Sequence, residues 1–478
     1  MGRKNSKNCG YADVLIGLQY GDEGKARVVD MLAKDYDVIA RFNGGANAGH
    51  TIETNEGVKV ALQQIPSGIF YPDKLLYVGS GCVINIEKIT LEIDRLKQIN
   101  VDLSKRLRLS CQASIIQPHH ILIDVQTGKT IGTTRNGIGP CYADKAYRMD
   151  GDRLLNIKLG DLNDDPKKYF AIIKENLMAA AKMYGLSMKE IGDSDDLIKK
   201  LEAGFRKIKK HIESDTLYLE KKAQSGARIL FEGAQSIMLD ITKGSVPYVT
   251  SSNTVAAAAY VGGDLSPSYH RKTIGIAKAI MSRVGHGPFA SEFGGKRSED
   301  YCMTAVNGKP KYSQTVEIDY GVEKLLKSKE DFDIGVALRI LSREYGTVTT
   351  RPRRVGILDL VQLSYAIRMN GVNELVINKC DVLNVFTSTK KAKIPLVVGY
   401  KLDGKNIDYV PGSVISYYKV KPVVEYLNSF RGTVSHIKDF KALPGALREF
   451  VLTVERKCGC KITGIGVGPE RDQFVKIN

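Results

Sequence analysis

The chain has 478 residues, of which 43% are hydrophobic and 26% charged, an ordinary balance for a folded protein with a large core. Lysine and arginine number 70 against 53 acidic residues, so the formal net charge is +17. The basic residues are spread along the chain without a nucleic-acid-binding signature. This pattern argues against nucleic acid as a partner and favours small polyanionic substrates in a basic cleft.

Membrane and disulfide signals are both weak in this chain. No apolar run approaches eighteen residues, so we expect no membrane span and no membrane partner. The eight cysteines are scattered, and neither a second pair nor a nearby histidine joins Cys458 and Cys460 in a zinc site. Reduced thiols and a cytoplasmic location are therefore predicted.

Apolar, β-branched runs alternate with helical patterns along the chain. We predict strands at 14–18, 38–40, 76–78, 227–231, 273–280, 375–377 and 461–467, and helices at 86–99, 166–184 and 355–369. This alternation predicts an α/β fold with a large, mostly parallel central sheet flanked by helices. Residues 160–225 and 291–345, the latter with a helix near 320–329, look like insertions into a single elaborated domain, 1–478.

The first glycine-rich loop, Gly21-Asp22-Glu23-Gly24-Lys25, follows the first predicted strand and precedes a helical pattern. Such a loop directs backbone N–H groups and a lysine at an anion. It is not a Walker A loop, because the GxxxxGK[ST] pattern is absent. The acid Asp22 would repel phosphate unless a metal bridges them or the carboxylate takes a proton during the reaction. The loop is therefore predicted to be catalytic.

A second glycine-rich loop, residues 43–51, follows the second predicted strand and ends in His50 and Thr51. Ligands of parallel sheets lie beyond the carboxyl ends of the strands, and both loops hold that position. His50 can reach phosphate oxygens or a leaving group from there. The alternative is a structural histidine.

Asn378-Lys379-Cys380-Asp381 follows a predicted strand and has the N-K-x-D spacing used by GTPases. The Asp381 carboxylate can accept from guanine N1–H and from the exocyclic amine together, and the Lys379 stem can pack along the base. Alone, this tetrapeptide could be a surface turn. Beside a phosphate loop it favours GTP over ATP.

Three further loops carry polar groups suited to anions or bases. Residues 131–140 form a glycine-rich cradle with two threonines, and Gln235 offers an amide to a purine edge. The turn 345–354 interleaves threonines with arginines, which suits a dicarboxylate or a phosphate. Taken alone, residues 131–140 and Gln235 could equally belong to ordinary loops. For the turn 345–354 a solvated basic turn is the weaker alternative, because hydroxyls are interleaved with the charges.

Together these stretches resemble the adenylosuccinate synthetase family. The matching segments run in the family's order over essentially the whole chain outside the two insertions: 21–25, 44–51, 131–134, 137–140, 231–235, 248–254, 351–354, 379–381 and 468–469. The resemblance implies a GTPase-like, P-loop-related fold. It also implies a ligase of AMP biosynthesis that uses GTP to join L-aspartate to IMP through 6-phosphoryl-IMP, giving adenylosuccinate, GDP and phosphate.

The resemblance assigns roles residue by residue. Catalysis would use Asp22, Lys25, His50 and Gln235, and Mg²⁺ would be held by Asp22 and the Gly49 carbonyl. The residues implied for IMP are Asn47, Thr134, Arg148, Gln235, Thr250 and Arg351. Those implied for GTP are Glu23, Gly24, Lys25, Gly49, His50, Thr51, Arg353, Lys379, Asp381, Gly466 and Gly468. Those implied for aspartate are Thr347, Thr349, Thr350 and Arg351. Arg148 would reach the partner's site, which implies a homodimer.

The chain departs from the usual family pattern at several loop positions. Ala26 and Arg27 stand where Gly-Lys is usual, and Arg135-Asn136 where Gly-Arg is usual. Thr350 replaces a glycine and Gly466 a common serine. Two alternatives therefore stay open: a related synthetase that aminates GMP or dGMP, and a GTP-binding regulatory module without catalysis. Retention of Asp22, and of Lys379 and Asp381 in the guanine turn (residues 378–381), argues for IMP and GTP.

Overall fold

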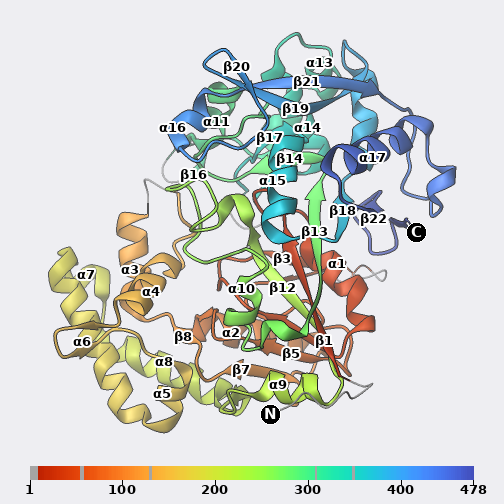
Figure 1. Ribbon diagram of the computed structural model, residues 1–478. Coiled ribbons are helices and arrows are strands. Elements are labelled where there is room, and N and C mark those ends of the chain that lie inside the picture. Colours follow the sequence, from red (N-terminus) through yellow and green to blue (C-terminus); the bar gives the residue numbers. More distant parts are fainter. Residues whose placement is uncertain are drawn as a thin grey trace.

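A ten-stranded sheet runs through the computed structural model, which describes residues 9–53, 57, 59–128, 132–306, 309–346 and 350–477 (Figure 1). Every neighbouring pair of strands is parallel except the last. The α/β prediction is confirmed. The spatial order is β11 (Ile212–Glu213), β7 (Leu107–Ser110), β5 (Leu75–Val78), β2 (Val38–Arg41), β12 (Arg228–Ser236), β1 (Tyr11–Gly17), β13 (His270–Lys278), β18 (Glu374–Asn378), β22 (Ile462–Gly466) and β23 (Phe474–Lys476).

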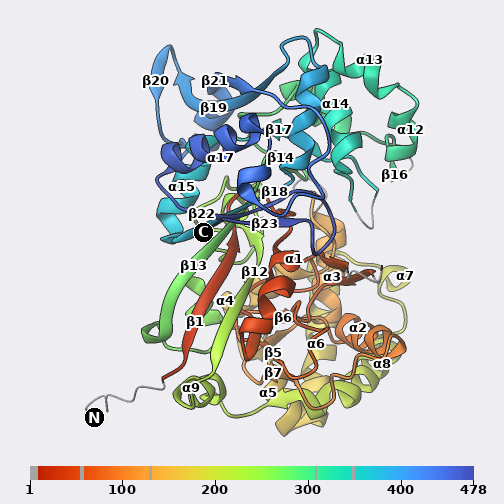
Figure 2. The same cartoon turned by 90° about the vertical axis from the view of Figure 1, so that its right-hand side faces the viewer.

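The sheet is buried on both faces, as β1 illustrates. Ala12, Val14 and Ile16 belong to one hydrophobic cluster and Leu15 to the other, because successive side chains of a strand point to opposite faces. The first cluster includes residues of α9 (Tyr218–Gln224), α10 (Ala258–Gly262), α15 (Leu360–Asn370) and α17 (Gly445–Cys458). The second includes residues of α1 (Lys25–Leu32), α2 (Ile86–Gln98), α5 (Leu159–Asp164), α6 (Pro166–Tyr184) and α8 (Ser194–Ile208). Figure 2 shows α2 and α8 side by side at the lower right.

Most predicted strands and two of the three predicted helices match elements of the structure, but two patterns were misread. The run at 273–280 is divided between β13 and β14 (Ile280–Arg283). The helix predicted at 355–369 is wrong in its first part, because β17 (Arg354–Ile357) pairs there antiparallel with β14. The helix α15 starts only at Leu360, where the Asp359 side chain caps it by accepting from Gln362 N at 3.1 Å.

The two segments read as insertions are mainly helical. Residues 160–225 comprise most of α5, then α6, α7 (Met188–Ile191), α8 and α9, while β11 adds an edge strand to the main sheet. Residues 291–345 contain α11 (Gly295–Met303), β15 (Ala305–Val306), β16 (Lys309–Pro310), α12 (Gln314–Ile318), α13 (Val322–Leu326) and α14 (Asp331–Ser342). The helix expected near 320–329 is the shorter α13. A single domain stays a prediction. Among the described residues, no helix is long and apolar enough to cross a bilayer.

The remaining elements form the upper part of Figure 1 and the surroundings of the sheet's upper edge. The upper part contains a three-stranded sheet of β20 (Lys405–Ile407), β19 (Lys393–Leu402) and β21 (Lys421–Asn428), with α16 (Val414–Lys419) nearby. Nearer the sheet lie the hairpin of β3 (His50–Glu53) and β4 (Lys59–Leu62), and the helices α3 (Pro118–Thr127) and α4 (Ile138–Tyr147). The loops of the predicted site lie between these parts.

Candidate active site

The predicted site loops leave the carboxyl ends of strands that are neighbours in the sheet. In spatial order these strands are β2, β12, β1, β18 and β22, with β13 lying between β1 and β18. The phosphate loop follows β1, the His50 loop follows β2, and Gln235 lies at the end of β12. The guanine turn follows β18, and Gly468 follows β22. Segments far apart in sequence therefore meet at one edge, as expected for a parallel sheet.

Two cavities open at this edge and share a wall. The first has a volume of about 430 Å³ and the second about 450 Å³. Asp22, Gly24 and Thr51 line both. The phosphate loop therefore separates two compartments of similar size, and Asp22 faces each of them.

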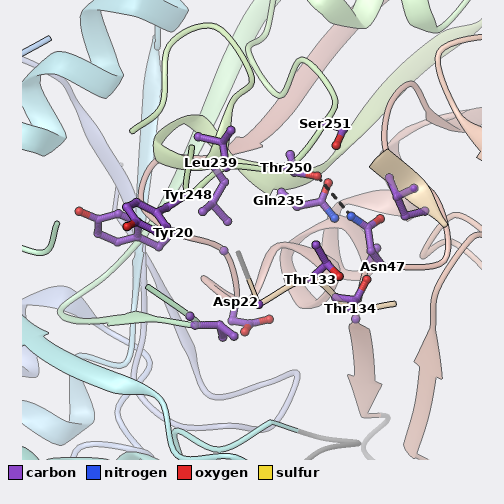
Figure 3. A pocket seen from close by; sticks show the side chains of 18 of the residues that line it. Tyr20, Asp22, Asn47, Thr133, Thr134, Gln235, Leu239, Tyr248, Thr250 and Ser251 are labelled. Carbon is purple, nitrogen blue, oxygen red and sulfur yellow. Dashed lines mark hydrogen bonds between the residues drawn. The ribbon is translucent and has the colours of Figure 1, made fainter. Parts of the chain in front are cut away.

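The first cavity brings together most of the residues implied for IMP (Figure 3). Asn47 Nδ2 donates to Thr250 Oγ1 at 3.3 Å, and Gln235 and Thr134 lie close to this pair. At the opposite end of Figure 3 lie Tyr20 and Tyr248. The cavity therefore combines an amide- and hydroxyl-rich end with an aromatic end.

The second cavity brings together the residues implied for guanine. Its lining includes Lys379, Asp381 and Gly468, together with Glu23 and Gly24 of the phosphate loop. The Glu23 side chain itself is fully buried, where it holds Lys25 Nζ at 2.6 Å and accepts from Gly21 N. These two contacts of the Glu23 side chain hold the phosphate loop in its conformation.

Three of the non-glycine predicted site residues that line the cavities adopt left-handed backbone conformations. The φ angles are 58° at Asp22, 56° at Gln235 and 60° at Lys379. Non-glycine residues rarely adopt this region, and such strain concentrates at functional sites. In each case the loop turns sharply at the end of its strand, and the side chain lies in a cavity wall.

His50 is buried and paired with the fully buried Glu232 through Nδ1. Burial lowers the pKa of His50, and Glu232 opposes this shift. Burial alone would raise the pKa of Glu232, but His50 and Arg41 outweigh it and the pKa is lowered. The pair is thus a neutral imidazole that donates Nδ1–H to a carboxylate, which leaves Nε2 for a ligand. A phosphate oxygen beside Nε2 would favour the protonated ring.

Glu344 connects the two sides of the site. It is fully buried, and its carboxylate contacts Lys278 Nζ at 3.0 Å, Arg353 Nη1 at 2.8 Å and also Lys379 Nζ. Burial alone would raise the pKa of Glu344, but the three cations hold it well below the ordinary range. Arg353 Nη2 in turn lies 2.9 Å from Asp22 Oδ2. A continuous chain of ion pairs therefore joins the guanine turn to the acid of the phosphate loop.

Some predicted residues lie away from the cavity walls. Arg148 is exposed at the end of α4, and Thr350, Arg351 and Gly466 line neither cavity among the described residues. Thr347 and Thr349 lie outside the described residues. Their roles stay predictions.

Sequence reasoning missed Glu232 and Glu344 as parts of the site. Glu232 lies within the matching segment 231–235 and Glu344 directly precedes the turn 345–354, but a lone acid in a sequence gives no sign of a buried partner. Tyr20, Asp124 and the segment 284–286 also line the first cavity without having been singled out.

One metal-type cluster occurs among the described residues, formed by His119, His120 and Asp144 with ligand atoms within 4.8 Å of one another. His120 Nδ1 accepts from Gln117 N at 3.0 Å, so its Nε2 carries the proton that it donates to Asp144 at 2.9 Å. Burial lowers the pKa of His120 to about 4, which keeps the ring neutral. A protonated Nε2 is no metal ligand, and the cluster is explained by hydrogen bonding.

The fold and the site define an α/β protein with two cavities of nucleotide size on either side of an acidic phosphate loop. The family model of adenylosuccinate synthetase matches residues 14–475. The chain belongs to the adenylosuccinate synthetase family, and it is a ligase.

Individual relatives match over nearly the full chain. "Adenylosuccinate synthetase 2" of Cupriavidus pinatubonensis is 45% identical over 97% of this chain and 97% of its own. The adenylosuccinate synthetase of Acetivibrio thermocellus is 36% identical over 97% of this chain and 99% of its own. The structure of the fully ligated Plasmodium falciparum enzyme is 30% identical, with a TM-score of 0.82 over 98% of this chain and 100% of that one.

Proposed function

We propose that this enzyme uses GTP to ligate L-aspartate to IMP, giving adenylosuccinate, GDP and phosphate in AMP biosynthesis. The observation that carries the proposal is the position of Asp22 in the wall between two nucleotide-sized cavities. A base in that wall can deprotonate a substrate in one cavity while a phosphoryl donor lies in the other. Family membership gives the same reaction.

In the first half-reaction Asp22 would take the N1 proton of IMP. The IMP O6 would then attack the γ-phosphorus of GTP, forming the O6–P bond as the bond to the β-phosphate oxygen breaks. His50 and Lys25 line the first cavity and would offset the charge of the phosphoryl group in flight. Support comes from the Glu232 contact, which orients the His50 ring.

In the second half-reaction the aspartate amine would attack C6 of 6-phosphoryl-IMP, and the C6–O bond would break to release phosphate. Asn47, Thr134, Gln235 and Thr250 would hold IMP, since all four line the first cavity. Arg351 would contact IMP and the aspartate carboxylates, with Thr347, Thr349 and Thr350 beside it.

On the GTP side, Lys379 and Asp381 would read the guanine, with the backbone at Gly466 and Gly468 beside them. The side chain of Arg353 and the segment 49–51 would face the phosphates. Arg353 supports this assignment by being held between Asp22 and Glu344 at the shared wall. Glu23 and Gly24 would contribute backbone groups to the phosphate cradle.

Magnesium is proposed at the same wall. Asp22 offers a carboxylate that is 35% exposed, and Gly49 lies in the lining of the first cavity with its backbone carbonyl. Hard oxygen donors of this kind suit Mg²⁺. When bound, the ion would offset the negative charge of the phosphate oxygens. Such an ion would explain why a loop that binds phosphate contains the acid Asp22.

The test is an assay of phosphate release and of the adenylosuccinate absorbance change with purified protein. We expect turnover only when IMP, GTP and L-aspartate are all present with Mg²⁺, and only slow turnover when ATP replaces GTP. Omission of each substrate in turn provides the control. Faster turnover of GMP or dGMP would instead identify the related synthetase, and GTP binding without turnover would identify the regulatory module.

We also propose a cytoplasmic homodimer in which Arg148 reaches the partner's site. Arg148 is exposed at the end of α4, between Tyr147, which is 63% exposed, and Met149, which is 45% exposed. An arginine flanked by exposed apolar side chains suits an isologous interface. Location in the cytoplasm is supported by the eight free thiols.

Arg148→Ala and Asp22→Asn homodimers are each expected to be almost inactive, whereas their mixture should recover about a quarter of wild-type activity. Half of randomly formed dimers are hybrids, and each hybrid has one site with both residues intact. The two variants, co-expressed with different affinity tags, allow the hybrid to be purified and assayed. No recovery in the purified hybrid would show that Arg148 acts within its own chain.

A further inference from the structure

Arg27 lies in the first turn of α1 and has no role in the reaction proposed above. Its guanidinium donates through Nη1 to the Gly468 carbonyl at 2.6 Å and through Nη2 to the Gln473 carbonyl at 2.7 Å. The side chain also lines the second cavity, as do Asn378, Lys379 and Asp381 of the guanine turn. One residue of the phosphate-loop helix therefore holds two points of the segment 466–473.

The two acceptors require an arginine. A guanidinium presents its donors in a planar fork, whereas a lysine ammonium is a compact point charge on a flexible stem. The two carbonyls are five residues apart in sequence, and each accepts a hydrogen bond from a different nitrogen of the same guanidinium. A lysine at position 27 could satisfy only one of them well.

Gly466 has no side chain and so leaves room for the side chains of Asn378 and Arg27. A Cβ added there would lie 2.5 Å from Asn378 Oδ1 and 3.3 Å from Arg27 Nη1. Asn378 cannot retreat easily, because its Nδ2 donates to the Glu23 carbonyl at 2.6 Å and the side chain is buried. Gly466 therefore leaves room mainly for Asn378 and, less tightly, for Arg27 at the end of β22.

Arg27 also contributes charge to the guanine turn. Burial raises the pKa of Asp381, and Lys379 and Arg27 oppose this shift. Asp381 must be ionised to accept two hydrogen bonds from guanine. Arg27 therefore acts on the base-reading acid as well as on the backbone beside it.

We propose that Arg27 is a positioning residue for guanine, which holds the 466–473 segment against the second cavity, and that the glycine at 466 leaves room for this arrangement. The proposal rests on the use of GTP proposed above. Positions 27 and 466 both depart from the usual family pattern, and the proposal gives them one shared role, which is to set the affinity for the guanine nucleotide.

The test compares Arg27→Lys and Arg27→Met with wild type. We expect the GTP KM to rise about tenfold for lysine, which loses one of the two hydrogen bonds, and about a hundredfold for methionine, which loses both. The kcat at saturating GTP and the KM for IMP should stay within about twofold. The matched control is Arg471→Lys, because Arg471 ties the same segment to Asp30 of α1 but does not line the cavity.

Gly466→Ser provides the second arm. Alone it should raise the GTP KM, and combined with Arg27→Lys it should raise it by clearly less than the product of the single effects, because the two side chains share one space. Independent effects, an equal rise in the Arg471 control, or parallel changes in kcat and both KM values would overturn the proposal. Calorimetry with GDP distinguishes failure of the proposed function from failure of the Arg27 proposal. If wild type binds GDP but shows no turnover, the proposed function fails. The GDP dissociation constants of the Arg27 variants then test the Arg27 proposal.

Discussion

Asp22→Asn is expected to lower kcat by about 10³-fold, the size of a lost general base. Asparagine has the shape of aspartate, keeps an oxygen for Mg²⁺ and tolerates the left-handed backbone at position 22, where φ is 58°. The variant therefore removes the proton acceptor with little change to the loop. Steady-state kinetics with all three substrates measures the loss.

Nucleotide binding separates this loss from damage to the site. Calorimetry should give GDP and IMP dissociation constants within a few-fold of wild type. Asp35→Asn is the control of matched chemistry and should retain full activity. Asp35 is exposed and lies just beyond α1, the helix that follows the phosphate loop. A kcat above one tenth of wild type for Asp22→Asn would contradict the assignment of Asp22 as the base.

Glu344→Gln is expected to combine a large loss of stability with a large loss of GTP use. Neutralising this buried carboxylate leaves Lys278, Lys379 and Arg353 without their shared anion. Uncompensated buried charge of this kind costs about 3 kcal/mol or more. We expect a lower midpoint of thermal unfolding and a kcat/KM for GTP at least about tenfold lower, since both the guanine turn and Asp22 lose support.

Two comparisons keep this prediction sharp. Asp196→Asn breaks an exposed ion pair with Lys200 and should change stability by less than about 1 kcal/mol. The double variant with Lys278→Met removes one surplus cation and should regain part of the lost stability. Wild-type melting and kinetics in Glu344→Gln would refute the proposed coupling between guanine turn and catalytic acid.

The sequence predicted the parts of this fold that depend on local pattern. Runs such as 14–18 and 375–377 are continuous apolar strands because both sheet faces are covered, and the loops after them carry glycine and charge. Because these strands are parallel and adjacent, their loops had to converge, and most predicted site residues do line the two cavities. The order of the motifs along the chain added the assignment of one cavity to IMP and of the other to GTP.

The parts that depend on distant partners were not predictable in this way. The segment 354–357 reads as the start of a helix, and only its pairing with β14, about 70 residues earlier, makes it a strand. Glu232 and Glu344 are isolated acids in sequence, and each is explained only by a buried imidazole or cation from a distant part of the chain. Hydrophobic periodicity carries no information on such pairs.

The left-handed residues of the site also limit how this enzyme can be stabilised. Holding Asp22, Gln235 and Lys379 in that conformation costs on the order of 1 kcal/mol or more each, which the rest of the fold must offset. Glycine at any of the three would relieve the strain and remove the chemistry at once. Selection for heat resistance alone would therefore favour inactive variants here, and a thermostable enzyme must draw its stability from other positions.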